Sequence, residues 1–208
     1  MRQTTLPAVQ DSPKTHMLHD VQQQILKELT CPLKDAARNM VFGKGNPDAP
    51  IMFIGEAPGE KEDEQGIPFV GRAGQELDKL LASIGLHLEN IYIANILKYR
   101  PPKNRDPTTQ EIRNHTPYLI EQIHIIQPTI IAPLGNYAMK FVLAGFDVDG
   151  MKKIGGITHL HGKAIDKEIK GRSYKIVPLY HPAAMLYRPQ LRSVLEEDFQ
   201  KMKDILKI

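Results

Sequence analysis

The sequence predicts an α/β protein, a three-layer α/β/α sandwich with a central four-stranded parallel sheet. Four short, largely apolar runs at residues 51–54, 91–96, 129–134 and 174–179 resemble strands that are buried on both faces. Segments with helical periodicity separate these runs. Strands that alternate with helices over this length are typical of a parallel sheet covered on both sides.

Helices are predicted, in order, at residues 18–29, 74–84, 108–126, 135–143 and 191–206. The first has apolar residues at positions 18, 21, 25, 26 and 29, which fall on one helical face. Gly85 is typical of the residue that follows a helix end. Thr108 and Glu111 have the spacing of a capping box, which starts the third helix. Loops or short strands are expected at residues 144–172, which are rich in glycine and lysine and show no long periodic pattern.

Composition limits the class of protein. With 208 residues and 41% hydrophobic content, residues 18–208 are expected to form a single domain, and the polar residues 1–17 a flexible leader. The net charge of +3 gives no global argument for nucleic acid. The single cysteine excludes a disulfide framework and fits the cytoplasm. No apolar run is long enough to span a membrane.

Side chains able to do chemistry follow three of the predicted strands. Glu56, Glu62 and Phe69 lie in the acidic loop after the first strand, Asn95 near the end of the second, and His181 after the last. The carboxyl ends of parallel strands share one edge of a sheet, where ligands bind, so these side chains are expected to share a pocket. Taken singly, Asn95 also fits a turn, His181 an ordinary loop and Phe69 the core.

Four segments closely resemble the family-four uracil-DNA glycosylases: GEAPGEKEDEQGIPFVGRAG, YIANILKYRPPKNRDPT, TIIAPLGNYA and YHPAAML. The resemblance covers residue 28 to the C-terminus, with the segments in the same order. It implies the uracil-DNA glycosylase fold and hydrolysis of the bond between a flipped deoxyuridine base and its sugar. It also implies a monomer.

By this resemblance, Phe69 would stack on the extruded uracil and Asn95 would read its Watson–Crick edge. One amide offers a donor to O4 and an acceptor to N3–H, which distinguishes uracil from cytosine. His181 would stabilise the negative charge that develops as uracil departs. Ala57, beside the uracil site, stands where fast glycosylases carry a water-positioning aspartate. Glu56 or Glu62 is therefore expected to position water, and Glu62 alternatively to disfavour the thymine methyl group.

The resemblance also suggests which residues contact DNA. Basic and polar side chains would contact phosphates, Gly71 and Gly74 would let the backbone approach the strand closely, and an apolar wedge would fill the stack after flipping. The phosphate group comprises Arg72, Lys98, Arg100, Lys103, Asn104, Arg105 and Arg188, and the wedge comprises Met185, Leu186 and Tyr187. Burial against the last helix is the alternative for the wedge residues.

The sequence departs from the family in its cysteines. The family holds a four-iron, four-sulphur cluster with four cysteines, and Glu28, Tyr99 and His115 stand at three of those positions, leaving only Cys31. We therefore predict no cluster and no other cofactor. A zinc ion on Glu28, Cys31 and His115 is a rival hypothesis, because all three are possible ligand types.

The predicted function is that of a monofunctional uracil-DNA glycosylase in base-excision repair, with water as the nucleophile. Its expected partner is uracil-containing DNA, single- or double-stranded, and no membrane. Three alternatives stay open at this point: excision of another deaminated base, DNA binding without turnover, and hydrolysis of free nucleosides. The basic loop at residues 98–105 favours a polymeric substrate.

Overall fold

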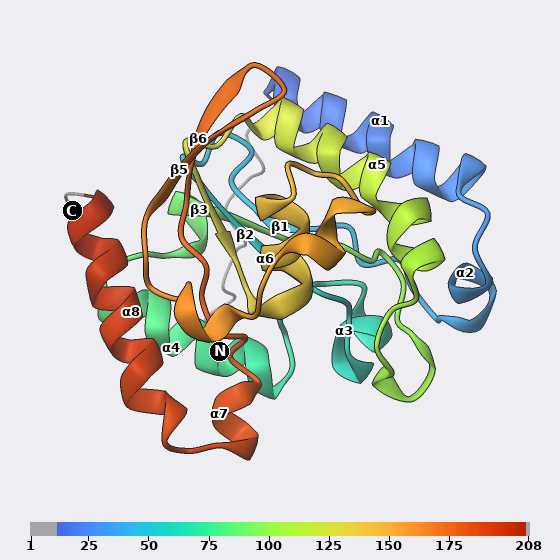
Figure 1. Cartoon of the computed structure of the whole chain (residues 1–208). Coiled ribbons are helices and arrows are strands. Elements are labelled where there is room, and N and C mark those ends of the chain that lie inside the picture. The colour runs from blue at the N-terminus through green and yellow to red at the C-terminus, as the bar shows by residue number, and fades with distance from the viewer. Residues whose placement is uncertain (1–11, 207–208) are drawn as a thin grey trace, which may run out of the picture.

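The computed structural model describes residues 12–206, in which one mixed sheet is covered by helices on both faces (Figure 1). The strand order is β1-β3-β2-β4-β6-β5. The central strands β3, β2, β4 and β6 are parallel, which confirms the predicted four-stranded parallel core. The two edge strands β1 and β5 are antiparallel; β1 was not predicted, and β5 lies in the region where loops or short strands were expected. The strands are β1 (Lys44–Gly45), β2 (Ile51–Gly55), β3 (Ile91–Asn95), β4 (Ile130–Pro133), β5 (Ile165–Ile169) and β6 (Arg172–Ile176).

Alternate residues of the central strands face two separate cores. Met52 and Ile54 of β2 pack in the core beneath α1 (Pro13–Glu28), α5 (Thr109–Ile126) and α6 (Gly135–Leu143). Ile51 and Phe53 pack in the core beneath α4 (Arg72–Ser83) and α8 (Leu191–Leu206). Phe53 stacks on Phe199 of α8 at 6.2 Å between ring centroids. Figure 1 shows α1, α5 and α6 on one side of the sheet and α4 and α8 on the other. The sheet is therefore the middle of three layers, as predicted.

Most helices lie where periodicity placed them. They are α1 (Pro13–Glu28), α2 (Pro32–Ala36), α3 (Glu60–Gln65), α4 (Arg72–Ser83), α5 (Thr109–Ile126), α6 (Gly135–Leu143), α7 (Ala184–Tyr187) and α8 (Leu191–Leu206), with 3₁₀ turns at Leu88–Asn90, Pro102–Asn104, Gly150–Lys153 and Ile157–His159. The predicted capping box is present, because Glu111 N donates to Thr108 and Thr108 N donates to Glu111.

Two expectations about local structure were wrong. The first helix begins at Pro13 rather than residue 18, because Ser12 caps it by accepting from Thr15 N at 3.3 Å. Residues 1–11 of the predicted leader lie outside the described residues. The acidic loop after β2 contains the helix α3, whose first-turn carboxylates suit a helix N-terminus and whose end at Gly66 is left-handed, at φ 71°.

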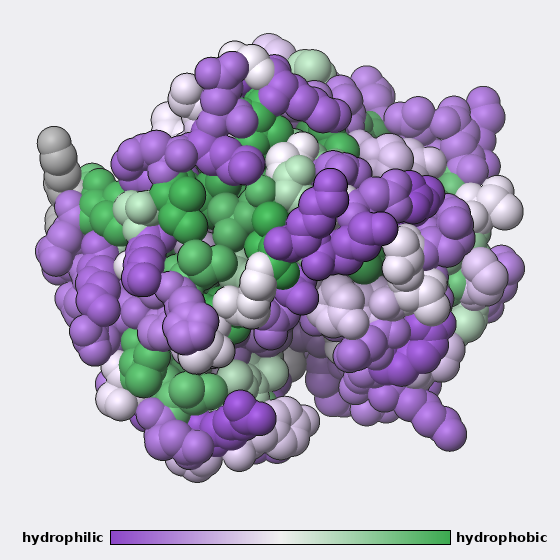
Figure 2. All heavy atoms as spheres, in the orientation of Figure 1, coloured by the Kyte–Doolittle hydropathy of each residue, from purple (hydrophilic) through white to green (hydrophobic). Residues whose placement is uncertain are grey.

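A hollow opens at the carboxyl edge of the sheet. Figure 2 shows it between the part of the surface that carries α7 and the part that carries α3. The residues after β2, β3 and β6 line it. Within residues 12–206, no helix is long and apolar enough to cross a membrane.

Candidate active site

The hollow is a cavity of about 550 Å³ that collects side chains from every strand-end loop named by the sequence. Glu56, Ala57, Glu62, Phe69, Asn95 and His181 all line it. This volume suits one small ligand, such as a nucleobase, together with part of its sugar. The expectation that these side chains share one pocket is therefore met by the geometry.

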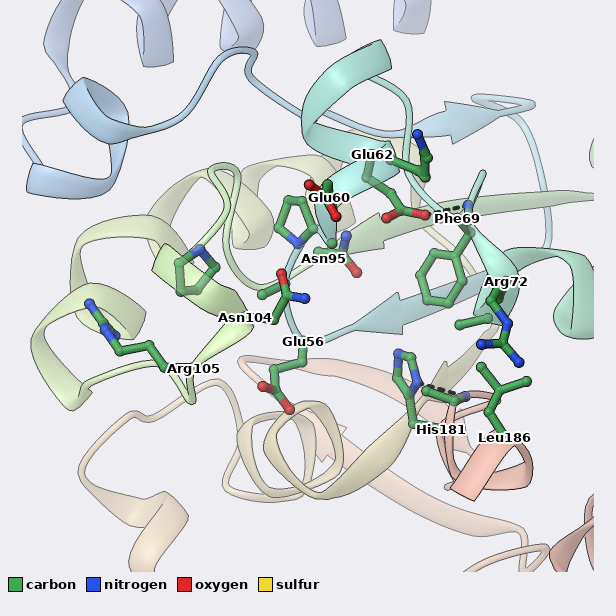
Figure 3. Close-up of a pocket in the computed structure, with 18 of the residues that line it drawn as sticks. Glu56, Glu60, Glu62, Phe69, Arg72, Asn95, Asn104, Arg105, His181 and Leu186 are labelled. Atoms are coloured by element: carbon green, nitrogen blue, oxygen red, sulfur yellow. Dashed lines mark hydrogen bonds between the residues drawn. The ribbon is translucent and has the colours of Figure 1, made fainter. Parts of the chain in front are cut away.

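Asn95 and Phe69 form the floor of the cavity (Figure 3). Asn95 ends β3, pairs in register with Gly55 of β2, and is only 2% exposed. Its amide oxygen Oδ1 has no hydrogen-bond partner among the described residues. A Cβ at Gly55 would overlap this oxygen and would lie 2.8 Å from Cζ of Phe69. Glycine therefore creates the space that both side chains occupy, and the amide oxygen of this cavity-lining residue is buried and unpaired.

The backbone of Phe69 is held in a left-handed conformation, at φ 51°. Glu62 Oε1 accepts from the backbone N–H groups of Val70, at 2.9 Å, and Gly71, at 2.7 Å, and Lys44 Nζ donates to Phe69 O at 3.0 Å. Gly74 of α4 packs directly against the Phe69 carbonyl, where any side chain would collide. These contacts fix an unfavourable conformation that presents the aromatic ring to the cavity.

The His181 ring stacks beside the Phe69 ring, with the centroids 5.6 Å apart, and both side chains line the cavity. Burial lowers the pKa of His181 to about 4, so that the imidazole is neutral at neutral pH. Its Nδ1 accepts from Ala183 N at 3.2 Å, which places the remaining proton on Nε2. His181 is therefore a neutral N–H donor. Gly135 lets this residue approach the start of α6, because a Cβ there would lie 3.2 Å from His181 Cβ.

The two glutamates of the cavity differ in their surroundings. Glu62 is hydrogen-bonded to the Phe69 loop, whereas the Glu56 carboxylate has no hydrogen bond to any residue in 12–206. Burial, and secondarily the charge of Asp106, raise the pKa of Glu56 to about 7. Asp106 in turn accepts from the Tyr137 hydroxyl at 3.2 Å. Glu56 is thus poised to exchange a proton near neutral pH.

The predicted DNA-contacting residues fall into three groups in the structure: those that line the cavity, those near the surface and those that are buried. Gly71, Arg72, Asn104, Arg105, Leu186 and Tyr187 line the cavity mouth, and Arg100, Lys103 and Arg188 lie at or near the surface. Tyr187 is 85% exposed. Arg105 is already bound to both carboxylate oxygens of Glu111, an ion pair that lowers the pKa of Glu111 to about 2. Arg100 donates to Asn104 at 2.8 Å.

Three of these predictions are contradicted by burial. Lys98 is fully buried and cannot reach a phosphate, because its side chain turns inward to carbonyl oxygens. Met185 is 3% exposed and packs in the core beneath α8, so that it cannot serve as a wedge. Gly74 is buried against the Phe69 backbone rather than facing a DNA strand.

The residues at the cluster positions do not fit a four-thiolate cluster. The chain has one cysteine, Cys31, which is buried. The rings of Tyr99 and His115 pack edge to face, with centroids 6.1 Å apart, and His115 Nδ1 accepts from Lys98 N at 2.9 Å. Glu28 is exposed on α1. In the described part of the chain, no three His, Cys, Asp or Glu side chains are grouped to hold a metal ion. Independence from a cofactor stays a prediction.

Sequence reasoning missed two residues that shape the site. Lys44, in the short edge strand β1, holds the Phe69 carbonyl, and Asp106 raises the pKa of Glu56. Neither lies in a pattern that indicates a site, because each acts through a neighbour that is distant in sequence. Lys44 stands out only as a cation between two glycines.

Comparison with known families identifies the class of protein to which this fold and cavity belong. Residues 42–207 match the family model described as the uracil DNA glycosylase superfamily, and the chain belongs to this family.

Its relatives narrow the class further. The chain is 44% identical to the type-4 uracil-DNA glycosylase of Archaeoglobus fulgidus, over 90% of this chain and 92% of that one. It is 41% identical to the type-4 uracil-DNA glycosylase of Sulfurisphaera tokodaii, over 90% and 84% respectively. The type-4 uracil-DNA glycosylase of Thermotoga maritima is 40% identical, over 93% of this chain and 97% of its own length.

Proposed function

We propose that this protein is a uracil-DNA glycosylase that flips deoxyuridine out of DNA and hydrolyses its N-glycosidic bond. The products are free uracil and an abasic site, which place the enzyme at the first step of base-excision repair. Membership of the superfamily and 40–44% identity to type-4 enzymes over most of the chain support this function. The observation that carries the chemistry is the buried, unpaired amide oxygen of Asn95 beside Phe69.

Asn95 and Phe69 bind the base in this mechanism. The unpaired Oδ1 of Asn95 accepts from N3–H of uracil, and its Nδ2 donates to O4. Cytosine has no N3–H and carries an amino group in place of O4, so that the same amide is left unpaired against it. Phe69 offers its ring face to the flipped base, and its fixed backbone keeps the ring in place.

His181 stabilises the leaving group. As the glycosidic bond lengthens, negative charge develops on the uracil ring, and a neutral N–H donor directed at O2 stabilises that charge. Because Nδ1 of His181 is occupied by Ala183 N, its Nε2–H is the group available to the base. Water adds to the sugar carbon, and its proton is lost to solvent or a nearby carboxylate. Because water is the nucleophile, no lysine adduct forms.

We assign the two glutamates to different tasks. Glu56 positions the attacking water, because its carboxylate has no other partner in the described chain and its pKa of about 7 suits a proton acceptor. Glu62 positions the Phe69 loop, because one of its oxygens already accepts from Val70 and Gly71. Its second oxygen lies beside Gly59.

The Glu56 assignment predicts an acid limb in the pH profile. Only the ionised carboxylate can accept a proton, so the single-turnover excision rate should rise with pH and reach half its plateau near pH 7. Asp106→Asn removes a neighbouring negative charge but keeps an acceptor for Tyr137, and it should shift this midpoint to lower pH. Rates measured across a pH series check both points. An unmoved midpoint in Asp106→Asn would assign the limb to another group.

The DNA strand is proposed to cross the cavity mouth. Arg72, Lys103 and Arg188 are exposed cations in position to contact phosphates, with the Gly71 backbone beside them. The exposed Tyr187 and the neighbouring Leu186 are the wedge candidates that the structure leaves accessible. We further propose that the protein acts as a monomer in the cytoplasm, without a cofactor, on single- or double-stranded DNA.

Excision from a labelled oligonucleotide with one deoxyuridine tests the proposed function, with alkali cleavage at abasic sites as the readout. Asn95→Ala should lower the single-turnover rate by about 10²-fold or more, because base-recognition and orientation are lost together. Asn114→Ala on α5 is the matched control and should retain full activity. Full activity in Asn95→Ala would place base recognition elsewhere, and inactivity of the parent protein on either strand form would overturn the function.

A further inference from the structure

Lys98, three residues beyond Asn95, is completely buried and makes three hydrogen bonds through its side chain. Nζ donates to Gln122 Oε1 at 2.6 Å, to Asn95 O at 2.8 Å and to Phe42 O at 3.5 Å. These acceptors belong to α5, to the end of β3 and to the segment before β1. One side chain therefore joins three parts of the fold behind the base-binding floor.

The hydrogen bonds of Lys98 suit an ammonium group. Its nitrogen has three oxygen acceptors, and only the protonated form has three N–H donors. No carboxylate in residues 12–206 forms an ion pair with it. Burial lowers the pKa of Lys98 to about 7. A buried cation without a counter-charge is costly for stability, and lysine is rarely fully buried without a partner, so the burial of Lys98 points to a task beyond packing.

The backbone around Lys98 is fixed as firmly as its side chain. Lys98 N donates to His115 Nδ1 at 2.9 Å, and Lys98 O accepts from Val41 N at 2.8 Å. Ile96 N and Leu97 N continue the pairing with β2 by donating to Gly55 O and Glu56 O, both at 3.0 Å. The chain that leaves Asn95 thus has little freedom to move.

The side chain of Asn95, in contrast, lines the cavity and has a buried oxygen without a hydrogen-bond partner among the described residues. Its orientation toward a base depends on the position of its own backbone. The Asn95 carbonyl is the group that Lys98 Nζ binds, so that the ammonium controls the peptide unit that follows the uracil-reading residue.

We propose that Lys98 is a positioning residue for base recognition, which holds the Asn95 carbonyl so that the Asn95 amide meets the Watson–Crick edge of uracil. The ammonium acts through Asn95 and contacts neither base nor phosphate. This inference rests on the proposed role of Asn95, and it replaces the phosphate contact that the sequence predicted for Lys98.

Lys98→Met tests the proposal, because it removes the ammonium and keeps a long apolar side chain. The single-turnover excision rate at saturating enzyme should fall by about 10- to 100-fold, since small displacements of a positioning group have effects of this size. Affinity for an abasic-site oligonucleotide, and its salt dependence, should stay unchanged. Lys27→Met is the matched control at an exposed lysine of α1 that has no proposed role, and it should leave the excision rate, the affinity for abasic DNA and the salt dependence unchanged.

A double-mutant cycle with Asn95→Ala separates positioning from a purely structural role. If Lys98 acts through Asn95, Lys98→Met should cost less than about 3-fold in the Asn95→Ala background. An equal loss in both backgrounds would overturn the proposal, and so would a weakened affinity for abasic DNA. Full activity of Asn95→Ala alone would instead refute the proposed role of Asn95, which is a separate result.

Thermal unfolding measures the stability of each variant as a control, and all excision rates are measured well below the unfolding temperature of each protein. If Lys98→Met does not fold, Gln122→Met provides the second test, because it removes one acceptor of the ammonium and leaves Lys98 and Asn95 unchanged. It should lower the excision rate in the same direction, and again only while Asn95 is present. A folded Gln122→Met protein whose loss is independent of Asn95 would contradict the proposal.

Discussion

Replacing His181 with alanine is expected to lower the single-turnover rate of uracil excision by about 10²- to 10³-fold, the usual effect of removing one donor to a developing anion. The reason lies in the state of the imidazole. It is neutral, with its proton on Nε2, because burial lowers its pKa to about 4 and Ala183 N occupies Nδ1. The donor is therefore present throughout the neutral range, and its loss should not depend on pH there.

Two further variants sharpen this experiment. His181→Gln places an amide N–H near the position of Nε2 and should recover part of the lost rate. His124→Ala removes an exposed histidine of α5 and should leave the rate unchanged. Affinity for abasic DNA should be similar in all three proteins. If His181→Ala keeps more than about a tenth of the parent rate, leaving-group stabilisation belongs to another group.

Gly55→Ala should reduce excision by about 10²-fold although it adds a single methyl group. Any Cβ at this position overlaps Asn95 Oδ1 and lies 2.8 Å from the Phe69 ring. Both side chains are buried and their backbones are held in place, so they can yield only by moving away from the positions that line the cavity. The methyl group would therefore displace both groups that bind the base. Inhibition of the enzyme by free uracil should weaken in parallel.

Gly155→Ala is the matched control, because a Cβ at Gly155 has no neighbour within 4 Å. It should retain full activity and uracil inhibition. Thermal unfolding of Gly55→Ala distinguishes a local effect from a loss of fold, since the proposal requires a cooperative transition close to that of the parent. Full activity in a folded Gly55→Ala protein would mean that the base does not bind between Asn95 and Phe69.

The sequence alone determined the central architecture and the centre of the site. The apolar run at residues 51–54 followed by glycine predicted β2, and the Thr108–Glu111 spacing predicted the start of α5. Both are local signals, one of burial on two faces and one of reciprocal hydrogen bonding. Because parallel strands end at one edge, the positions of Asn95 and His181 at strand ends were enough to predict a shared cavity.

The burial and the hydrogen-bond partners of individual site residues could be learned only from the tertiary structure, because neighbours distant in sequence determine them. Lys98 and Lys103 belong to one basic loop, yet the first is buried behind Asn95 and the second is exposed. Glu56 and Glu62 are two glutamates of the same loop, and the sequence did not distinguish their roles. In the structure, Glu62 accepts hydrogen bonds from the Phe69 loop, whereas Glu56 lies beside Asp106. The edge strand β1 was missed, and residues 144–172 around β5 were predicted only as loops or short strands, because a short strand with polar residues carries no hydrophobic pattern. Burial and pairing depend on contacts across the fold, and the local pattern of a loop does not contain them.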